Sequence, residues 1–249
     1  MDREIVAVFV IVLLCAAGLA LLVYRYDMYE REPWYMLVLA VVLGMGAGWC
    51  VGHLEDATIA AFTDGNPSSA TRAAIAATHE EAAKLLAVVL IALVFARQFN
   101  DPMDGVIYGS FVGLGMAIDE SIYYQQLIRA TLSDVGTEAV RLVMHLLFGG
   151  IIGFALGMAR FRMRRWPLAL ALCAAAAVGI HFSWDMVVEL DPRDGALGGL
   201  QQVASIVLTL TAMLLYGVLV ALAARWSRAT FDVNSHRRLW HLPFGKPKR

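Results

Sequence analysis

Seven apolar segments of about 20 residues each constrain this chain more than any other feature. A helix of about 20 apolar residues spans the hydrocarbon core of a bilayer, and the connections between the segments are mostly short. The segments are residues 5–24, 33–52, 79–99, 105–124, 139–159, 166–189 and 200–224. We therefore predict an all-α, polytopic membrane helix bundle. Its seven transmembrane helices form one domain, residues 1–224, which a basic tail follows at residues 225–249.

The composition agrees with a membrane protein and excludes a soluble domain. Of the 249 residues, 59% are hydrophobic and 16% are charged, and the mean hydropathy is +0.65. This apolar content exceeds what one globular core of this size buries. The formal net charge is -1, and the basic residues cluster near the ends of apolar segments, which excludes a nucleic-acid-binding surface. Cys15, Cys50 and Cys173 lie in apolar stretches, and we predict that they are packing residues rather than disulfide or zinc partners.

The distribution of Lys and Arg predicts how the helices are oriented in the membrane. Four arginines lie within residues 160–165, between the fifth and sixth segments, and seven basic residues follow the last segment. Loops rich in Lys and Arg remain cytoplasmic. With seven spans, the N-terminus is then outside and the C-terminus is cytoplasmic. The long connection at residues 53–78, which contains a turn at residues 65–68, is expected outside.

Small residues recur in two spans at the spacing of helix contacts. They are Gly109 and Gly113 in the fourth span, and Gly149, Gly153 and Gly157 in the fifth. Glycines four residues apart let two helix backbones approach closely. We predict close helix packing here, without any chemistry.

Four of the predicted spans contain ionisable residues, and nine of these residues are candidates for a functional site. They are Glu80, Glu81 and Lys84 in the third span, Asp119 and Glu120 in the fourth, Arg141 and His145 in the fifth, and His181 and Asp185 in the sixth. Ionisable groups inside a membrane are costly, and they mark functional sites. With a rise of about 1.5 Å per residue and alternating span directions, the glutamates and histidines reach the outer third of the bilayer. We therefore predict one polar cluster near the outer face.

Several of these residues are spaced four apart and so share one face of a helix. Glu80 and Lys84 have the spacing of an ordinary ion pair. Arg141 lies near the end of its span, so its side chain can extend to the membrane surface. Asp185 lies four residues after His181 and can orient its imidazole ring, a usual role of a carboxylate beside a histidine.

Carboxylates beside imidazoles, in a cavity open to the outer face, suit the activation of water. A carboxylate in a low dielectric is a competent general base, and His nitrogens with a carboxylate oxygen also bind zinc. The spacing does not choose between these mechanisms, and no HExxH motif is present. Glu80 and Glu81 are rotated by about 100° from each other on a helix, which favours a metal-free, glutamate-activated water. If a divalent metal such as zinc is bound, its ligands are expected to be Glu81, His145 and His181.

The motifs around these residues resemble the PrsW family of intramembrane proteases, which is distantly related to the CAAX-protease and bacteriocin-processing superfamily. The matching segments are the acidic turn at 27–33, which ends in Glu-Pro, the EExxK segment at 79–84, the fourth-span segment at 104–120, His145, and His181 with Asp185. One residue departs from the family pattern. The aromatic residue usually found four positions before Glu120 is Met116 here.

The resemblance implies hydrolysis of a peptide bond near the outer membrane face, typified by site-one cleavage of a membrane-anchored anti-sigma factor. The implied site residues are Glu80, Glu81, Glu120, His145, His181 and Asp185. Glu81, with Glu80, would activate the attacking water, and the two histidines would position that water, bind a metal or stabilise the oxyanion. The implied partners are a single-span membrane protein and lipid, in the bacterial cytoplasmic membrane.

Two other classes of function remain alternatives at this point. One is a non-proteolytic membrane scaffold or a transporter with a proton-coupled carboxylate site. An inverted-repeat transporter would show two related halves and broken helices near the midplane, and we detect no such repeat. The other is a metal-dependent membrane lipid hydrolase, which would use the same polar cluster with a lipid-shaped pocket.

Overall fold

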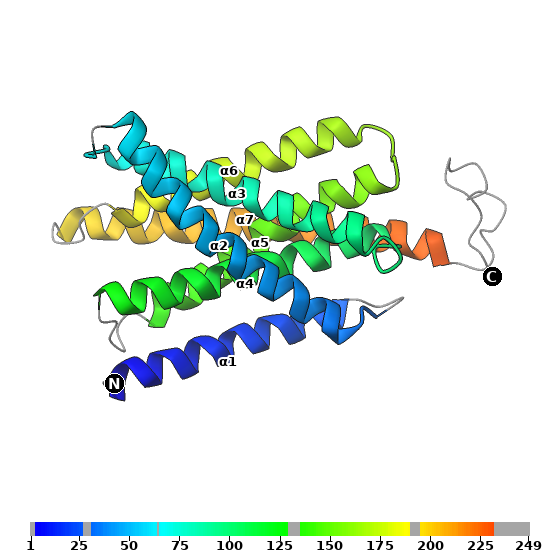
Figure 1. The fold of residues 1–249 in the computed structure, drawn as a ribbon, viewed down its shortest axis with the longest axis horizontal. Helices are drawn as coiled ribbons and strands as arrows, with labels where there is room; N and C mark the ends of the chain where they lie inside the picture. The colour runs from blue at the N-terminus through cyan, green and yellow to red at the C-terminus, as the bar shows by residue number, and fades with distance from the viewer. Residues whose placement is uncertain (1–2, 27–30, 64, 129–134, 190–194, 232–249) are drawn as a thin grey trace.

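The computed structural model describes residues 3–26, 31–63, 65–128, 135–189 and 195–231, and these ranges contain seven α-helices and no strand (Figure 1). The helices are α1 (Arg3–Tyr26), α2 (Trp34–Phe62), α3 (Ser69–Val94), α4 (Pro102–Ile128), α5 (Val135–Arg160), α6 (Trp166–Glu189) and α7 (Gly195–Phe231). Each predicted span coincides with one helix, apart from differences at the ends. The all-helical class is therefore confirmed.

Five of these helices are long and apolar enough to cross a membrane by themselves. They are α1, α2, α5, α6 and α7. The other two, α3 and α4, carry several of the ionisable residues noted above, which lower their apolar character. Their place in the bundle comes from their contacts with the apolar helices, since α4 packs along α5 and α2, and α3 packs against α2 and α6.

The long connection predicted at residues 53–78 is wrong over most of its length. Helix α2 continues to Phe62 and α3 begins at Ser69. The predicted turn lies between them. Ser68 caps α3 by accepting a hydrogen bond from a backbone N–H at 3.2 Å, and Gly65 has a φ of +77°, a conformation that glycine adopts readily. Hydropathy identifies the apolar part of a helix but not its end. The last turns of α2 and the first turns of α3 contain polar residues, so hydropathy did not identify them as helical.

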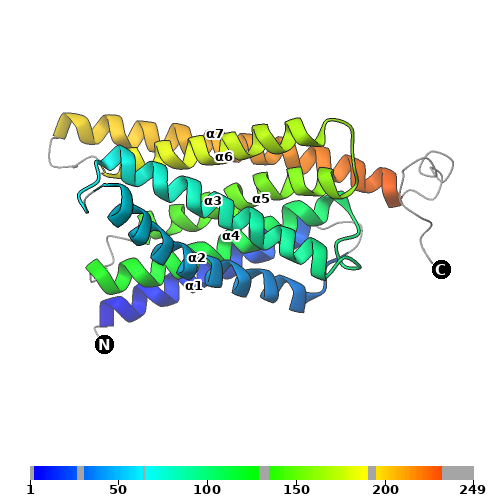
Figure 2. The same cartoon turned by 45° about the horizontal axis from the view of Figure 1, so that its top comes forward.

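Helix α5 forms the centre of the bundle and packs against α1, α3, α4, α6 and α7 (Figures 1 and 2). From Leu142 to Met158 nearly all its side chains are buried. Helix α4 runs antiparallel along it because glycines of the two helices face each other. A Cβ atom added at Gly109 would lie 2.2 Å from the carbonyl oxygen of Gly149. The predicted close contact between glycines of the fourth and fifth spans is confirmed.

The same glycine contact sets the register between two of the ionisable residues. A Cβ atom added at Gly113 would lie 2.0 Å from the carbonyl oxygen of His145. Glu120 follows Gly113 by two helical turns and so lies on the same face of α4. The packing of α4 on α5 therefore brings the carboxylate of Glu120 to the imidazole of His145.

The three cysteines form no disulfide in the described part of the chain. Cys173 is buried and Cys15 is half-buried, which agrees with the predicted packing role. Cys50 is exposed on α2, so the prediction is wrong for this residue. The neighbouring Trp49 is also exposed, which shows that this part of α2 faces away from the helices of the bundle.

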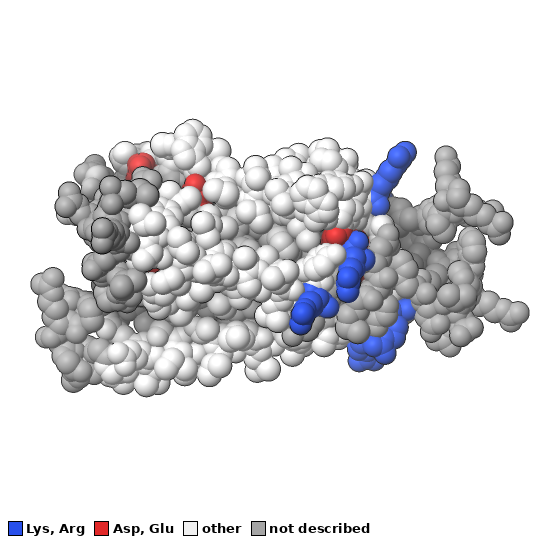
Figure 3. Space-filling model, turned by 90° about the horizontal axis from the view of Figure 1, so that it is seen from below, with Lys and Arg blue, Asp and Glu red and all other residues white. Residues whose placement is uncertain are grey.

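Nine exposed arginines gather at one end of the bundle, and Figure 3 shows part of this basic end in blue, whereas the exposed Arg72 lies near the start of α3 at the other end. They lie at the ends of α1, α3, α5 and α7, just before α2, and in the α5–α6 turn: Arg25, Arg31, Arg97, Arg160, Arg162, Arg164, Arg165, Arg225 and Arg228. Exposed apolar side chains such as Leu86, Leu93 and Leu214 lie between the two ends. This pattern is the one that a cytoplasmic end and a lipid-facing middle require.

Two sequence features fall partly or wholly outside the described residues. Helix α7 includes the start of the predicted basic tail and ends at Phe231, and residues 232–249 are outside the described ranges. In the acidic turn, residues 27–30 are also outside them, whereas Glu32 and Pro33 are described.

Buried carboxylates tie three helices together at the basic end. The hydroxyl group of Tyr108 in α4 donates a hydrogen bond to Glu32, which precedes α2. Asp104 accepts hydrogen bonds from two backbone N–H groups before α4, at 2.6 and 2.7 Å. The hydroxyl group of Ser227 in α7 donates to Asp101. The Glu-Pro end of the acidic turn is therefore docked on the start of α4.

The glycine contact between α4 and α5 makes a testable prediction about stability. In Gly149→Ala the new methyl group would lie 2.1 Å from the carbonyl oxygen of Gly109, so the helices must separate. We expect the free energy of unfolding in detergent micelles to fall by about 1–3 kcal/mol. The control is Gly179→Ala in α6, where no heavy atom lies within 4 Å of the added Cβ. Equal stability of the two variants would contradict the close contact.

Candidate functional site

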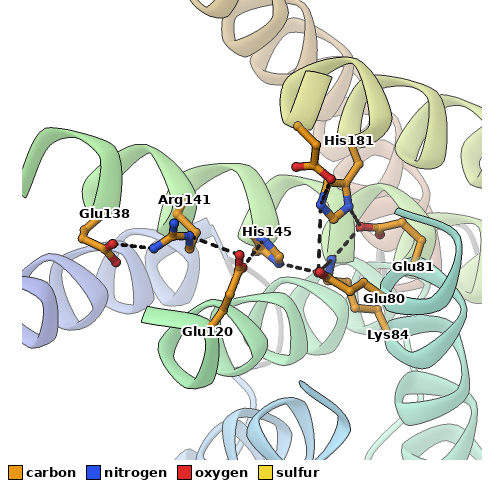
Figure 4. Close-up of polar contacts among 9 residues, drawn as sticks. Glu80, Glu81, Lys84, Glu120, Glu138, Arg141, His145 and His181 are labelled. Carbon is orange, nitrogen blue, oxygen red and sulfur yellow. Dashed lines mark hydrogen bonds and ion pairs between the residues drawn. The ribbon is translucent and has the colours of Figure 1, made fainter. Parts of the chain in front are cut away.

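Four helices bring their ionisable side chains together in the half of the bundle away from the basic end. The members of this cluster are Glu80, Glu81 and Lys84 from α3, Glu120 from α4, Arg141 and His145 from α5, and His181 and Asp185 from α6 (Figure 4). The predicted meeting of these helices at one depth therefore occurs. Asp119 of α4 lies beside Gly48 of α2 instead.

One carboxylate oxygen lies at the centre of the cluster. Oε2 of Glu80 is 3.5 Å from Nδ1 of His145 and 4.0 Å from Nε2 of His181. The ammonium group of Lys84 is 3.7 Å away. Oε2 of Glu80 and Nδ1 of His145 are both buried, and neither has a hydrogen-bond partner among the described residues. These polar atoms therefore lie close together, yet Oε2 of Glu80 and Nδ1 of His145 form no hydrogen bond with each other.

The other nitrogen of each imidazole is held from behind by a second carboxylate. Nε2 of His145 is 2.9 Å from Oε2 of Glu120, and Nδ1 of His181 is 2.7 Å from Oε1 of Glu81. A neutral imidazole has one N–H donor and one acceptor nitrogen, and the donor must face the carboxylate. With both imidazoles neutral and in these tautomers, the nitrogens that face Glu80 carry lone pairs. Two lone pairs and a carboxylate oxygen that converge on one point suit a bound cation.

The geometry fits a divalent metal ion. One ligand atom each from Glu80, His145 and His181 can be chosen so that all three lie within 4.8 Å of one another. In a tetrahedral zinc site with bonds of about 2.0–2.1 Å, ligand atoms are about 3.3–3.4 Å apart. The separations from Glu80 are 3.5 and 4.0 Å, so small side-chain movements suffice. Ligating histidines usually donate their other N–H to a carboxylate. His181 has such a hydrogen bond with Glu81, and the corresponding nitrogen of His145 lies 2.9 Å from a carboxylate oxygen of Glu120.

The structure separates the two adjacent glutamates of α3. Lys84 is fully buried and donates a hydrogen bond of 2.6 Å to Oε1 of Glu81, which also contacts His181. The sequence had suggested Glu81 as the metal ligand and the main activator of water. The structure instead groups Oε2 of Glu80 with one nitrogen of each histidine. The rotation of about 100° between neighbouring helical residues gives the two carboxylates different partners.

Asp185 also occupies a different place from the expected one. Its Oδ2 lies 3.6 Å from Nε2 of His181, the nitrogen that faces Glu80, whereas the orienting contact at Nδ1 comes from Glu81. The side chains of Asp185 and Glu120 are each 25% exposed, compared with 4% for His181. Asp185 and Glu120 therefore mark the accessible side of the cluster.

Arg141 turns inward, so the prediction that it extends to the membrane surface is wrong. Its Nε lies 3.3 Å from Oε1 of Glu120, and its Nη1 donates to the buried Glu138. The guanidinium group also lies 4.5 Å from the ring centroid of Tyr124. Sequence reasoning missed Glu138, although its position three residues before Arg141 is the spacing of a helical ion pair.

Two more residues that sequence reasoning missed border the cluster. Phe148 of α5 stacks on the ring of His181, with ring centroids 5.1 Å apart. Glu55 of α2 interacts electrostatically with Glu120 and His181. Glu55 had been assigned to the long outside connection, and only the continuation of α2 as a helix brings it to the site. An aromatic residue three positions after His145 gave no signal of a contact with the next helix.

Comparisons with known proteins agree with this site. Residues 32–222 match the family described as PrsW family intramembrane metalloprotease. Protease PrsW of Bacillus subtilis (strain 168) is 30% identical over 179 residues, which cover 70% of this chain and 79% of that protein. Protease PrsW of Geobacillus kaustophilus (strain HTA426) is 27% identical over 191 residues, which cover 76% and 84%. No solved structure matches this chain. The match contains every residue of the polar cluster, and the chain therefore belongs to the PrsW family of intramembrane metalloproteases.

Proposed function

We propose that this peptidase binds one divalent metal ion, such as zinc, through Glu80, His145 and His181, and hydrolyses a peptide bond of a membrane-anchored protein. One observation carries the proposal. Two imidazole nitrogens and a carboxylate oxygen converge, and each imidazole is held from behind by another carboxylate. The family description as a metalloprotease also supports a metal over the metal-free mechanism that the sequence favoured.

The residues around the proposed metal have separate tasks in this mechanism. A bound divalent ion supplies Lewis-acid activation of a water molecule and of the scissile carbonyl group. Glu81 and Glu120 keep the two imidazoles in the tautomers that leave the ligand nitrogens unprotonated. Asp185 lies on the accessible side, beside a ligand nitrogen of His181, yet outside the group of three ligand atoms. It is placed to accept the proton of the attacking water as a general base.

The proposed substrate is a single-span membrane protein that is cleaved near the outer face of the bacterial cytoplasmic membrane. Site-one cleavage of an anti-sigma factor is the reaction of this kind that the family resemblance implies. Two observations support this placement. Nine of the exposed arginines lie at one end of the bundle, which the positive-inside rule makes cytoplasmic. The polar cluster lies in the other half, and the side chains of Glu120 and Asp185 are each 25% exposed there.

The first prediction from this proposal concerns topology. In a variant without the three native cysteines, we introduce Asn66→Cys between α2 and α3 and, separately, Lys248→Cys in the tail. A membrane-impermeant thiol reagent should label position 66 in intact cells, and position 248 only after permeabilisation. Labelling of both positions from the same side would contradict an outside N-terminus with seven spans.

The second prediction concerns the metal. Purified wild-type protein should contain about one zinc or other divalent ion per chain, and phenanthroline should abolish its cleavage of single-span membrane proteins until metal is returned. Glu80→Gln, His145→Ala and His181→Ala should each lose the metal and at least about 100-fold in activity, because each removes a ligand. Full activity of metal-free wild-type protein would restore the metal-free mechanism. Wild-type activity of all three variants would show that the reaction does not take place at this site.

The third prediction separates the ligands from the carboxylates behind them. Glu81→Gln and Glu120→Gln should weaken metal affinity by about 10–100-fold, the usual effect of losing such a partner. Because the ligands remain, excess zinc should restore their activity but not that of Glu80→Gln. The control is Asp119→Asn, which changes an acidic residue beside α2 and should leave metal affinity unchanged. Rescue of Glu80→Gln by zinc, with no rescue of Glu81→Gln, would exchange the roles of the two glutamates.

A further inference from the structure

Helix α2 carries a carboxylate that the proposed mechanism does not use. Glu55 lies just under one turn before Thr58, whose hydroxyl oxygen is 3.5 Å from Nε2 of His79 in α3. This contact holds the second half of α2 against the helix that carries the central glutamate. Glu55 also lies two helical turns after Gly48 and so shares its face of α2, and Gly48 lies beside Asp119, the neighbour of Glu120 in α4. The charge of Glu55 is within electrostatic range of Glu120 and His181. It therefore borders the polar cluster from a fifth helix.

One oxygen of this carboxylate lacks a donor. Oε1 of Glu55 is covered by neighbouring atoms and has no hydrogen-bond partner among the described residues. The cations of the cluster are paired elsewhere, Lys84 with Glu81 and Arg141 with Glu120. A covered acceptor that remains unpaired is costly. The residue as a whole is only half-buried, so a small movement of its side chain lets this oxygen accept a hydrogen bond from a group that binds to the site.

A peptide segment about to be cleaved inside a membrane supplies such a donor. The scissile bond of a substrate helix is open to attack only when the helix unwinds locally, and unwinding frees backbone N–H groups. In a bilayer each freed N–H must find an acceptor in the protein. Helix α2 leaves room for this segment, because Val51 is its last fully buried residue and the following residues are exposed or half-buried.

We propose that Glu55 accepts a hydrogen bond from a backbone N–H of the unwound substrate segment and so positions the scissile bond beside the metal ligands. This inference rests on the proposed function and adds a substrate-positioning residue on α2. Glu55 does not hold the metal and takes no part in proton transfer. Its contribution is therefore to the binding of the peptide, and its loss should appear mainly in KM.

Two substitutions of similar size test this role. Glu55→Gln keeps an acceptor oxygen at the same position, whereas Glu55→Met removes it. The probe is the single-span membrane protein that the wild-type enzyme cleaves fastest, reconstituted with the enzyme in detergent micelles. We expect Glu55→Met to raise KM at least about tenfold, as the loss of a hydrogen bond to a buried acceptor allows, and Glu55→Gln to stay within about twofold of wild type. The control is Asp56→Asn, at the exposed neighbouring residue, with no change expected.

The metal content and thermal stability of each variant are measured on the same samples, and they should equal those of the wild type. Unchanged kinetics of Glu55→Met would overturn the inference. So would loss of metal from that variant, or an equal defect in the Gln and Met variants, which would assign the effect to metal binding or to charge. The proposed function fails differently, through wild-type protein that shows no metal-dependent cleavage, and that result would overturn both.

Discussion

Charged groups inside a membrane must be paired, and this requirement organises the centre of the protein. Glu138, Arg141 and Glu120 form a continuous series of opposite charges that ends at His145. On the other side of the site, Lys84 pairs with Glu81, which holds His181. Each imidazole therefore meets a carboxylate that is itself fixed by a buried or half-buried cation, so the rings are held before any ligand binds.

This arrangement depends on how closely the helices approach. The contact of α4 with α5 is made by glycine backbones, and a side chain at Gly113 would push Glu120 away from His145. Because four helices supply the cluster, a shift of one helix by a turn would break several charge pairs at once. The cost of unpaired charge in hydrocarbon then favours a single register. Packing and electrostatics thus select the same arrangement, which is why small residues and ionisable residues lie on the same faces.

Sequence alone predicted the helices and the membership of the site better than the roles of its residues. Hydropathy and the depth argument brought Glu80, Glu120, His145 and His181 together, because an apolar span has a fixed length and direction. The partner of each atom depends on side-chain direction, and hydropathy has no information about it. The sequence therefore could not predict that Glu81, rather than Asp185, contacts Nδ1 of His181. It also could not predict that Arg141 turns inward to Glu120. Glu55 was missed because polar residues concealed the last turns of α2.

The pairing also separates structural charges from those available for chemistry. Glu81 and Glu120 each contact both a cation and an imidazole, so their negative charge is already compensated. Glu80 differs, because Lys84 is farther from it than from Glu81 and its neighbouring imidazole nitrogens offer lone pairs rather than donors. The centre of the cluster is thus the place where the chain's own cations do not complete the charge balance. The divalent ion that we propose at this point would complete it.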